Sequence, residues 1–141
     1  MKRIFSVLFA LAVVVTTTST VYAQCSNATL TGGYAFIYGG ANAPGHSVRG
    51  KNTFGNAAVG VLTFDGAGGV TASYTAVFNG SAFSTSVPDT GTYTVNSDCT
   101  GTFTDTSIDI HFNLAIAGGG AEVFAIQTDA GNTDTFDAKK Q

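Results

Sequence analysis

Few side chains of this 141-residue chain have the types and the spacing that acid–base chemistry requires. His111 lies two residues from both Asp109 and Asn113, so in a β-strand the three side chains would share one face. A carboxylate beside an imidazole can orient the ring for proton transfer, which makes His111 a candidate acid or base. The alternate positions from Ile108 to Ile116 are all apolar, and we therefore expect the polar row to face solvent.

Glu122 is the only glutamate in the chain, and the alternation of a strand would put it on the same face as Phe124. On an apolar face, desolvation raises the pKa of a carboxyl group, which suits it to act as an acid or a base. We predict a ligand-binding site that includes Glu122, Phe124 and Tyr74, with Glu122 near an open rim, and we assign no catalytic residue. The simpler alternative is that Glu122 is exposed at the end of its strand, just after Gly120.

Two loops, 65–69 and 129–134, combine carboxylates with glycine and so resemble calcium-binding loops. Neither has the spacing of an EF-hand loop, in which the third position supplies an oxygen ligand and a bidentate glutamate ends the loop. Hairpin turns in which an aspartate side chain bonds to the following backbone explain both sequences. We therefore expect no metal site and no cofactor.

The first 23 residues have the features of a secretory signal peptide: Lys2 and Arg3, a short apolar stretch, and a small-x-Ala cleavage site that ends at Ala23. The apolar run is about a dozen residues, well below the roughly 20 that a membrane-spanning helix needs. A lipid anchor on Cys25 is the alternative, but the residues before it lack the leucine and the adjacent small residue of a lipobox. We therefore expect a secreted or periplasmic domain of residues 24–141, with no membrane insertion after the signal peptide (1–23) is cleaved.

Cys25 and Cys99 are the only two cysteines. In an exported chain an isolated pair forms a disulfide more often than a metal site, because two thiols without supporting histidines make a poor zinc site. We predict that the two are bonded, with their Cα atoms about 4.4–6.8 Å apart. The bond would join the start of the first strand to a turn in the second half of the chain.

The charge balance excludes several classes of partner. After removal of the leader, four basic residues remain against nine acidic ones, and the basic residues form no patch. Nucleic acids and anionic membrane surfaces are bound through clustered lysine and arginine, so neither is an expected partner. A small ligand or a protein partner remains.

Apolar and polar residues alternate through nearly all of residues 24–141, and clusters of Gly, Asn and Asp separate the segments at hairpin spacing. The pattern predicts a single all-β domain of eight or nine antiparallel strands, with no helix longer than two turns. Short connections favour a meander, which avoids open edges most simply by closing into a β-barrel; a β-sandwich is the alternative. The face with Leu62, Phe64, Tyr74 and Phe78 should be buried, because burial of large apolar side chains stabilises most.

Three segments carry a resemblance that covers most of residues 24–141: CSNATL at 25–30, VGVLTFDG at 59–66 and GTYTVNSDCTG at 91–101. Together they resemble a group of small exported bacterial proteins of unknown function, both cysteines included. The shape of that group resembles the barrels of calycins and allene oxide cyclases, so the resemblance implies a closed barrel. It implies no activity, because likeness of fold does not identify function.

We expect a secreted, non-enzymatic barrel that binds a small apolar or amphipathic molecule, or a protein partner, at its open end. One alternative is an enzyme of the cyclase or isomerase kind, with Glu122 as its carboxylate in an apolar cavity. The other is a structural module of the cell envelope or of an extracellular assembly, in keeping with strands rich in threonine and poor in charge. A barrel filled by its own side chains would weaken the first two hypotheses together.

Overall fold

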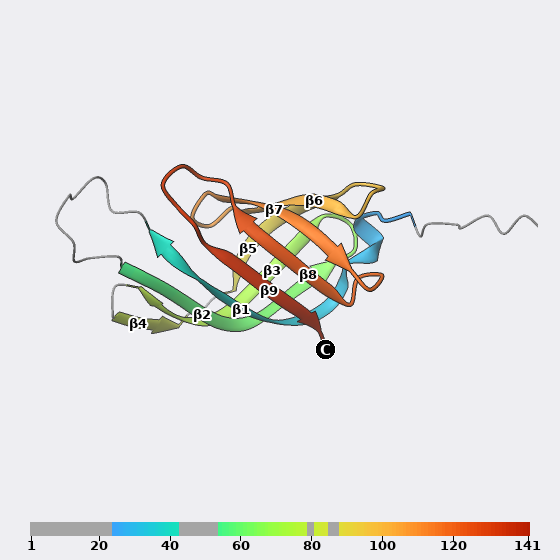
Figure 1. Cartoon of the computed structure of the whole chain (residues 1–141). Coiled ribbons are helices and arrows are strands. Elements are labelled where there is room, and N and C mark those ends of the chain that lie inside the picture. Colours follow the sequence, from blue (N-terminus) through green and yellow to red (C-terminus); the bar gives the residue numbers. More distant parts are fainter. Residues whose placement is uncertain (1–23, 43–53, 79–80, 85–87) are drawn as a thin grey trace, which may run out of the picture.

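The computed structural model describes residues 24–42, 54–78, 81–84 and 88–141, so the predicted signal peptide lies outside the described residues. Helical structure in the described part of the chain is limited to a short 3₁₀ turn, η1 (Asn27–Thr29), and the remaining regular structure is β-strand (Figure 1). The all-β prediction is confirmed. The strands are β1 (Thr31–Asn42), β2 (Phe54–Asp65), β3 (Gly69–Phe78), β4 (Ser81–Ser84), β5 (Asp89–Val95), β6 (Thr100–Asp105), β7 (Ile110–Ala117), β8 (Glu122–Gln127) and β9 (Thr135–Lys140).

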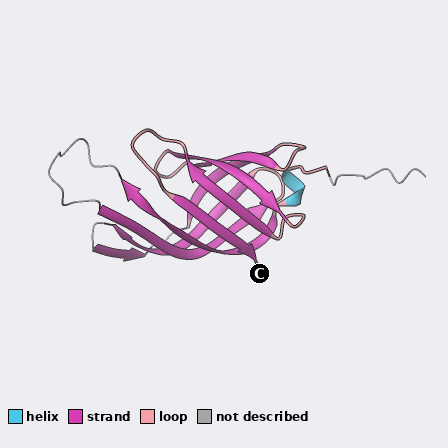
Figure 2. Ribbon diagram, in the orientation of Figure 1, coloured by secondary structure: helices cyan, strands magenta, loops and turns pink. Residues whose placement is uncertain are grey.

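Eight of these strands form a closed antiparallel barrel (Figure 2). Each strand pairs with the next around the ring, from β1 through β2, β3, β5, β6, β7 and β8 to β9, and β9 pairs again with β1. Closure gives every strand of the ring a partner on both sides, which is how a sheet avoids exposed edges. The predicted meander and its closure are confirmed, and the sandwich alternative is wrong.

The short strand β4 lies outside the ring and pairs with β3. Residues 69–72 of β3 pair with β5, whereas residues 75–78 pair with β4. β4 therefore extends the wall at one end of the barrel, at the lower left of Figure 1. We call this the open end; it also carries the β6–β7 connection (106–109) and the β8–β9 connection (128–134). The opposite end, which carries η1, is the closed end.

The closed end of the barrel is filled by its own side chains. The rings of Tyr34 and Tyr93 both pack edge-on against Phe64, with centroids 5.1 and 5.0 Å away. The hydroxyl of Tyr93 donates a hydrogen bond to the Leu30 carbonyl oxygen at 3.0 Å, and that of Tyr34 donates to the Gly120 carbonyl oxygen at 2.5 Å. These bonds hold the segment after η1 and the β7–β8 turn against the aromatic core, and so close this end.

Cys25 and Cys99 form a disulfide with their Cα atoms 5.0 Å apart, as predicted. The bond joins the segment before η1 to the β5–β6 turn. In the same place the Cys25 backbone N–H donates to the Ser97 carbonyl oxygen at 3.4 Å. The disulfide therefore fixes the start of the described chain to the closed end of the barrel.

The predicted inward face of β2 and β3 is largely confirmed. Leu62 and Phe64 are buried, and Tyr74 is partly buried and packs against the core. The side chain of Phe78 lies outside the described residues.

On β8 the face that Glu122 shares with Phe124 is the outer one, because Phe124 is 44% exposed, so the aromatic residue of this strand lies outside the barrel interior. The inward positions of this strand hold smaller side chains, among them Ala125, which lies between Leu114 of β7 and Phe136 of β9. Two large neighbours leave space for a small residue in a tightly packed interior. The size of the neighbouring side chains therefore decides which face of β8 is buried.

We predict that Phe64→Ala lowers the free energy of unfolding by about 3–5 kcal/mol, because it opens a cavity among buried rings. Ile37→Ala on the adjacent strand is the control: Ile37 is 65% exposed, so its loss should be about 0.5 kcal/mol or less. Urea unfolding followed by circular dichroism measures both. Equal losses would contradict the assignment of the inward face.

Replacement of both cysteines, Cys25→Ala with Cys99→Ala, should lower the free energy of unfolding by roughly 4 kcal/mol in the chain-entropy description. The two residues are 74 positions apart, so the bond restricts a long loop of the unfolded chain. Urea unfolding of the double variant and of the parent, with and without reductant, measures this. If reductant leaves the free energy of unfolding of the parent protein unchanged in the urea experiment, the result would argue against the disulfide.

Candidate functional site

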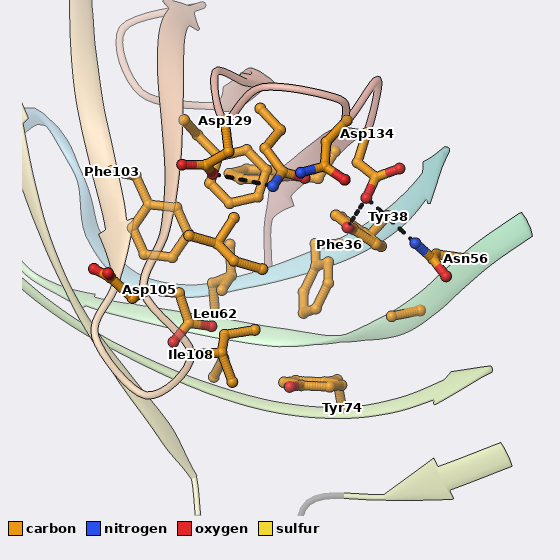
Figure 3. A pocket seen from close by; sticks show the side chains of 18 residues that line it. Phe36, Tyr38, Asn56, Leu62, Tyr74, Phe103, Asp105, Ile108, Asp129 and Asp134 are labelled. Carbon is orange, nitrogen blue, oxygen red and sulfur yellow. Dashed lines mark hydrogen bonds between the residues drawn. The ribbon is translucent and has the colours of Figure 1, made fainter. Parts of the chain in front are cut away.

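The half of the barrel near the open end is hollow. A cavity of about 420 Å³ lies there, with side chains from β1, β2, β3, β6, β7, β8 and β9 and from the open-end connections around it (Figure 3). Pockets that bind small molecules are typically about 300–1,000 Å³. The cavity is therefore large enough for a small organic ligand.

The wall of the cavity is aromatic. Phe103 and Phe112 stack with centroids 5.5 Å apart, and Phe136 packs against them at 6.0 and 5.4 Å. Phe36 continues the wall, 6.4 Å from Phe136 and 6.3 Å from Tyr74. These rings occupy inward positions on five strands, so closure of the barrel is what brings them together.

Asp134, just before β9, is a deeply buried carboxylate with 1% of its surface exposed. Its Oδ2 accepts hydrogen bonds from the Tyr38 hydroxyl and, at 3.5 Å, from Nδ2 of Asn56 (Figure 3). Burial and the neighbouring carboxylate raise the pKa of Tyr38 far above its usual range, so the hydroxyl stays protonated and donates. Gly40 makes room for this carboxylate, because a Cβ there would come within 1.9 Å of Asp134 Oδ1.

Tyr74 lies across the cavity from Asp134 (Figure 3). Its hydroxyl belongs to a second tyrosine–carboxylate pair, in which it donates to Asp89 at the start of β5. Burial raises the pKa of Tyr74, and Asp89 raises it further. Asp105, at the end of β6, lines the cavity. Burial raises the pKa of Asp105, and the negative charge of Asp89 adds to the increase. The open end thus carries carboxylates on several elements.

Asp129, in the β8–β9 connection, orients His111. Asp129 Oδ1 lies 2.9 Å from His111 Nδ1, and Oδ2 accepts from the His111 backbone N–H at 2.8 Å and from Gln127 Nε2 at 3.0 Å. These hydrogen bonds lower the pKa of Asp129 to about 2. About half of the His111 side chain is exposed, which confirms that the predicted polar row faces solvent. The carboxylate nearest the imidazole is Asp129, since Asp109 is 3.8 Å from Nε2.

Of the three residues predicted to bind a ligand, Tyr74 lines the cavity and Glu122 and Phe124 do not. Glu122 begins β8 toward the closed end, and its Oε1 is 3.1 Å from Nζ of Lys139. The expectation that Glu122 lies near an open rim is therefore wrong. That Tyr74, Glu122 and Phe124 bind a ligand stays a prediction.

Sequence reasoning missed three polar residues of the cavity: Asn56, Gln127 and Asp134. Asn56 and Gln127 each lie two positions from a buried apolar residue on the same strand, and Asp134 lies just before β9, two positions from the buried Phe136, so each occupies an inward position. A polar residue that interrupts the apolar face of a strand is the signal that could have identified them. From the sequence alone, such a residue looks the same as an exposed strand end.

The loop 65–69 forms the expected aspartate turn. Asp65 Oδ1 accepts hydrogen bonds from the backbone N–H groups of Ala67, Gly68 and Gly69 at 2.7, 3.0 and 2.8 Å, and these bonds lower the pKa of Asp65. This oxygen is therefore engaged by its own turn. Within the described ranges, no group of three or more His, Cys, Asp or Glu side chains is placed to hold a metal ion.

We predict that Asp129→Asn lowers stability at neutral pH, because the carboxylate accepts hydrogen bonds from two elements. An unperturbed carboxyl has a pKa of 3.8 and that of folded Asp129 is about 2, so this stabilisation is complete above pH 4 and is lost as pH falls from 4 to 2. Thermal unfolding from pH 7 to pH 2 measures the difference between parent and variant. The difference should shrink below pH 4; a constant difference would contradict the prediction.

No protein-family model, curated protein or solved structure matches this chain. Within the part that the structure describes, no helix has the length and the apolar character to cross a membrane. The function therefore has to be inferred from the barrel and its cavity.

Proposed function

We propose that this protein is a secreted, non-enzymatic β-barrel that binds a small molecule with an apolar body in the cavity at its open end. The single observation that carries the proposal is the 420 Å³ cavity with an aromatic wall. These rings pack against one another and also line the space, so the cavity has a continuous aromatic wall. Small-molecule sites commonly combine an apolar lining with a few polar groups that fix the orientation of the ligand.

The leader sequence and the disulfide support secretion. Disulfides persist in oxidising compartments such as the periplasm and the extracellular space, and residues 1–23 have the pattern of a signal peptide. The same proposal includes a relationship to the small exported bacterial proteins and to calycin-like or allene-oxide-cyclase-like barrels. An eight-stranded closed meander is compatible with it.

The other hypotheses have less support. The cyclase or isomerase alternative relied on Glu122, which is paired with Lys139 and does not line the cavity. A purely structural module has no need for a hollow interior. A protein partner is the second kind of occupant expected from the sequence. We place it after a small molecule because the aromatic cluster lines the inside of the barrel, whereas Phe124 is the large aromatic exposed on the outer surface of the described residues.

Filling the cavity tests the proposal. Ala72→Leu on β3 adds volume at a cavity-lining position and should weaken binding of N-phenyl-1-naphthylamine, an uncharged fluorescent probe, by about tenfold or more, equivalent to at least 1.4 kcal/mol. Ser73→Leu is the matched control, because Ser73 is the next residue along the strand and is exposed on the outer face.

Fluorescence titration measures the affinity of the three proteins, and thermal unfolding checks that each variant is folded. Equal affinity in the parent, Ala72→Leu and Ser73→Leu would place the probe outside the cavity and contradict the proposal. Native mass spectrometry of protein purified from its own source should also show a bound small molecule.

A further inference from the structure

On the basis of the proposed ligand-binding function, we propose that the ligand is an organic cation that donates hydrogen bonds: a protonated amine carried on an apolar, preferably aromatic, body. The inference names the ligand class for the same cavity. It is carried by the charges around the open end and by buried oxygen atoms that have no donor.

Among the described residues, the charged side chains that line the cavity are carboxylates. Its lining includes Asp105, Asp109, Asp129 and Asp134, which come from β6, the β6–β7 connection and the β8–β9 connection. Clefts lined by one sign of charge attract ligands of the opposite sign and disfavour those of the same sign. An anionic ligand, such as a fatty acid, would have to enter past these carboxylates.

The lysine side chains of the described ranges lie elsewhere, and the imidazole of His111 contacts Asp129 and Asp109 from outside the lining. Lys139 and Lys140 are at the end of β9, and neither lines the cavity. Lys139 pairs with Glu122 at 3.1 Å, and Nζ of Lys140 lies 5.8 Å from the ring centre of Tyr34 in the closed half. In the described part of the chain, then, no lysine or arginine neutralises the carboxylates of the cavity.

Two buried amides show what the polar part of the ligand must supply. Asn56 is 5% exposed and Gln127 is 7% exposed, and both occupy inward strand positions in the cavity lining. Nδ2 of Asn56 donates to Asp134, and Nε2 of Gln127 donates to Asp129. The pKa of Asp129 is lowered to about 2, so its carboxylate only accepts hydrogen bonds, and Gln127 must present Nε2 to it. Asn56 likewise presents Nδ2 to Asp134.

The fixed orientation leaves the two amide oxygens as the unsatisfied atoms. Asn56 Oδ1 and Gln127 Oε1 are buried and have no hydrogen-bond partner, and the same holds for Asp134 Oδ1. A buried acceptor without a donor costs about 1–3 kcal/mol. The two amide oxygens can only accept, so a ligand that satisfies them must donate hydrogen bonds, as an ammonium group does.

The aromatic wall favours the same ligand class. The rings of Phe36, Phe103, Phe112 and Phe136 offer their faces and edges to an apolar body, and a cation near an aromatic face gains a further cation–π attraction. A bare metal ion fits less well, since no metal-binding group of side chains occurs among the described residues. The cavity therefore combines an apolar wall with buried amide oxygens that have no hydrogen-bond donor and with carboxylates near the open end.

Three naphthalene probes of the same shape test the inference in the full mature protein: 2-(1-naphthyl)ethylamine, 2-(1-naphthyl)ethanol and 1-naphthaleneacetate. Isothermal titration calorimetry at neutral pH and low salt should show the amine binding at least about tenfold more tightly than the alcohol, and the carboxylate most weakly. Methylammonium, which carries the charge without the ring, should not compete with the amine.

Three substitutions test which carboxylates cause the preference for the amine over the alcohol. Asp134→Asn and Asp105→Asn should each weaken binding of the amine, Asp134→Asn by about tenfold, and leave binding of the alcohol within twofold. Asp98→Asn is the matched control, because it makes the same change in the exposed β5–β6 turn at the closed end, outside the cavity, and should change neither. If Asp134→Asn fails to fold, the affinity of Asp105→Asn for the amine and the ranking of the three probes in the parent protein still test the inference.

The outcomes separate this inference from the proposed function. Equal affinity for the amine and the alcohol would mean that a neutral donor or water satisfies the buried oxygens, and the cation inference would fail while a hollow binding barrel remained. Competition by methylammonium would indicate a site for small cations only and would also overturn it. If no naphthalene probe binds and Ala72→Leu leaves binding of the neutral probe unchanged, the proposed function itself fails.

Discussion

The pairing of β1 with β9 is the constraint on which the rest of the structure depends. It joins strands from opposite ends of the described chain, from Tyr34 opposite Lys140 to Gly39 opposite Thr135, and turns a meander into a ring. Once the ring is closed, each strand has one face toward an enclosed interior. An open sheet of the same strands would have neither a filled closed end nor a cavity.

The closed barrel is divided along its axis into a half that is filled by its own side chains and a half that contains the cavity. The tyrosines show the difference most clearly. Tyr34 and Tyr93 donate to backbone carbonyl oxygens at the closed end, and these bonds hold the β7–β8 turn and the segment after η1 against the core. Tyr38 and Tyr74, nearer the open end, donate to the carboxylates of Asp134 and Asp89 instead. The disulfide lies at the closed end, so covalent and packing constraints are concentrated away from the cavity.

The open half keeps features that a barrel selected for stability alone would avoid. Buried acceptors without donors and a buried carboxylate cost free energy, and apolar residues at positions such as Asn56 and Gln127 would remove that cost. Departures from consistent local design are expected at functional sites, where stability elsewhere in the molecule compensates for them. The filled closed end is the part of this barrel that can provide that compensation.

The sequence by itself determined the strands, the disulfide, the meander and the burial of Leu62 and Phe64, because alternation, turn residues and an isolated cysteine pair are local signals. It did not determine which face of β8 points inward, since that depends on the sizes of neighbours on β7 and β9. Nor did it bring Asp134 to Tyr38, or Asp129 to His111, because these contacts cross between strands whose register and closure are set by the whole ring. Local patterns fix each strand, but only tertiary structure decides which polar residues share the end of a barrel.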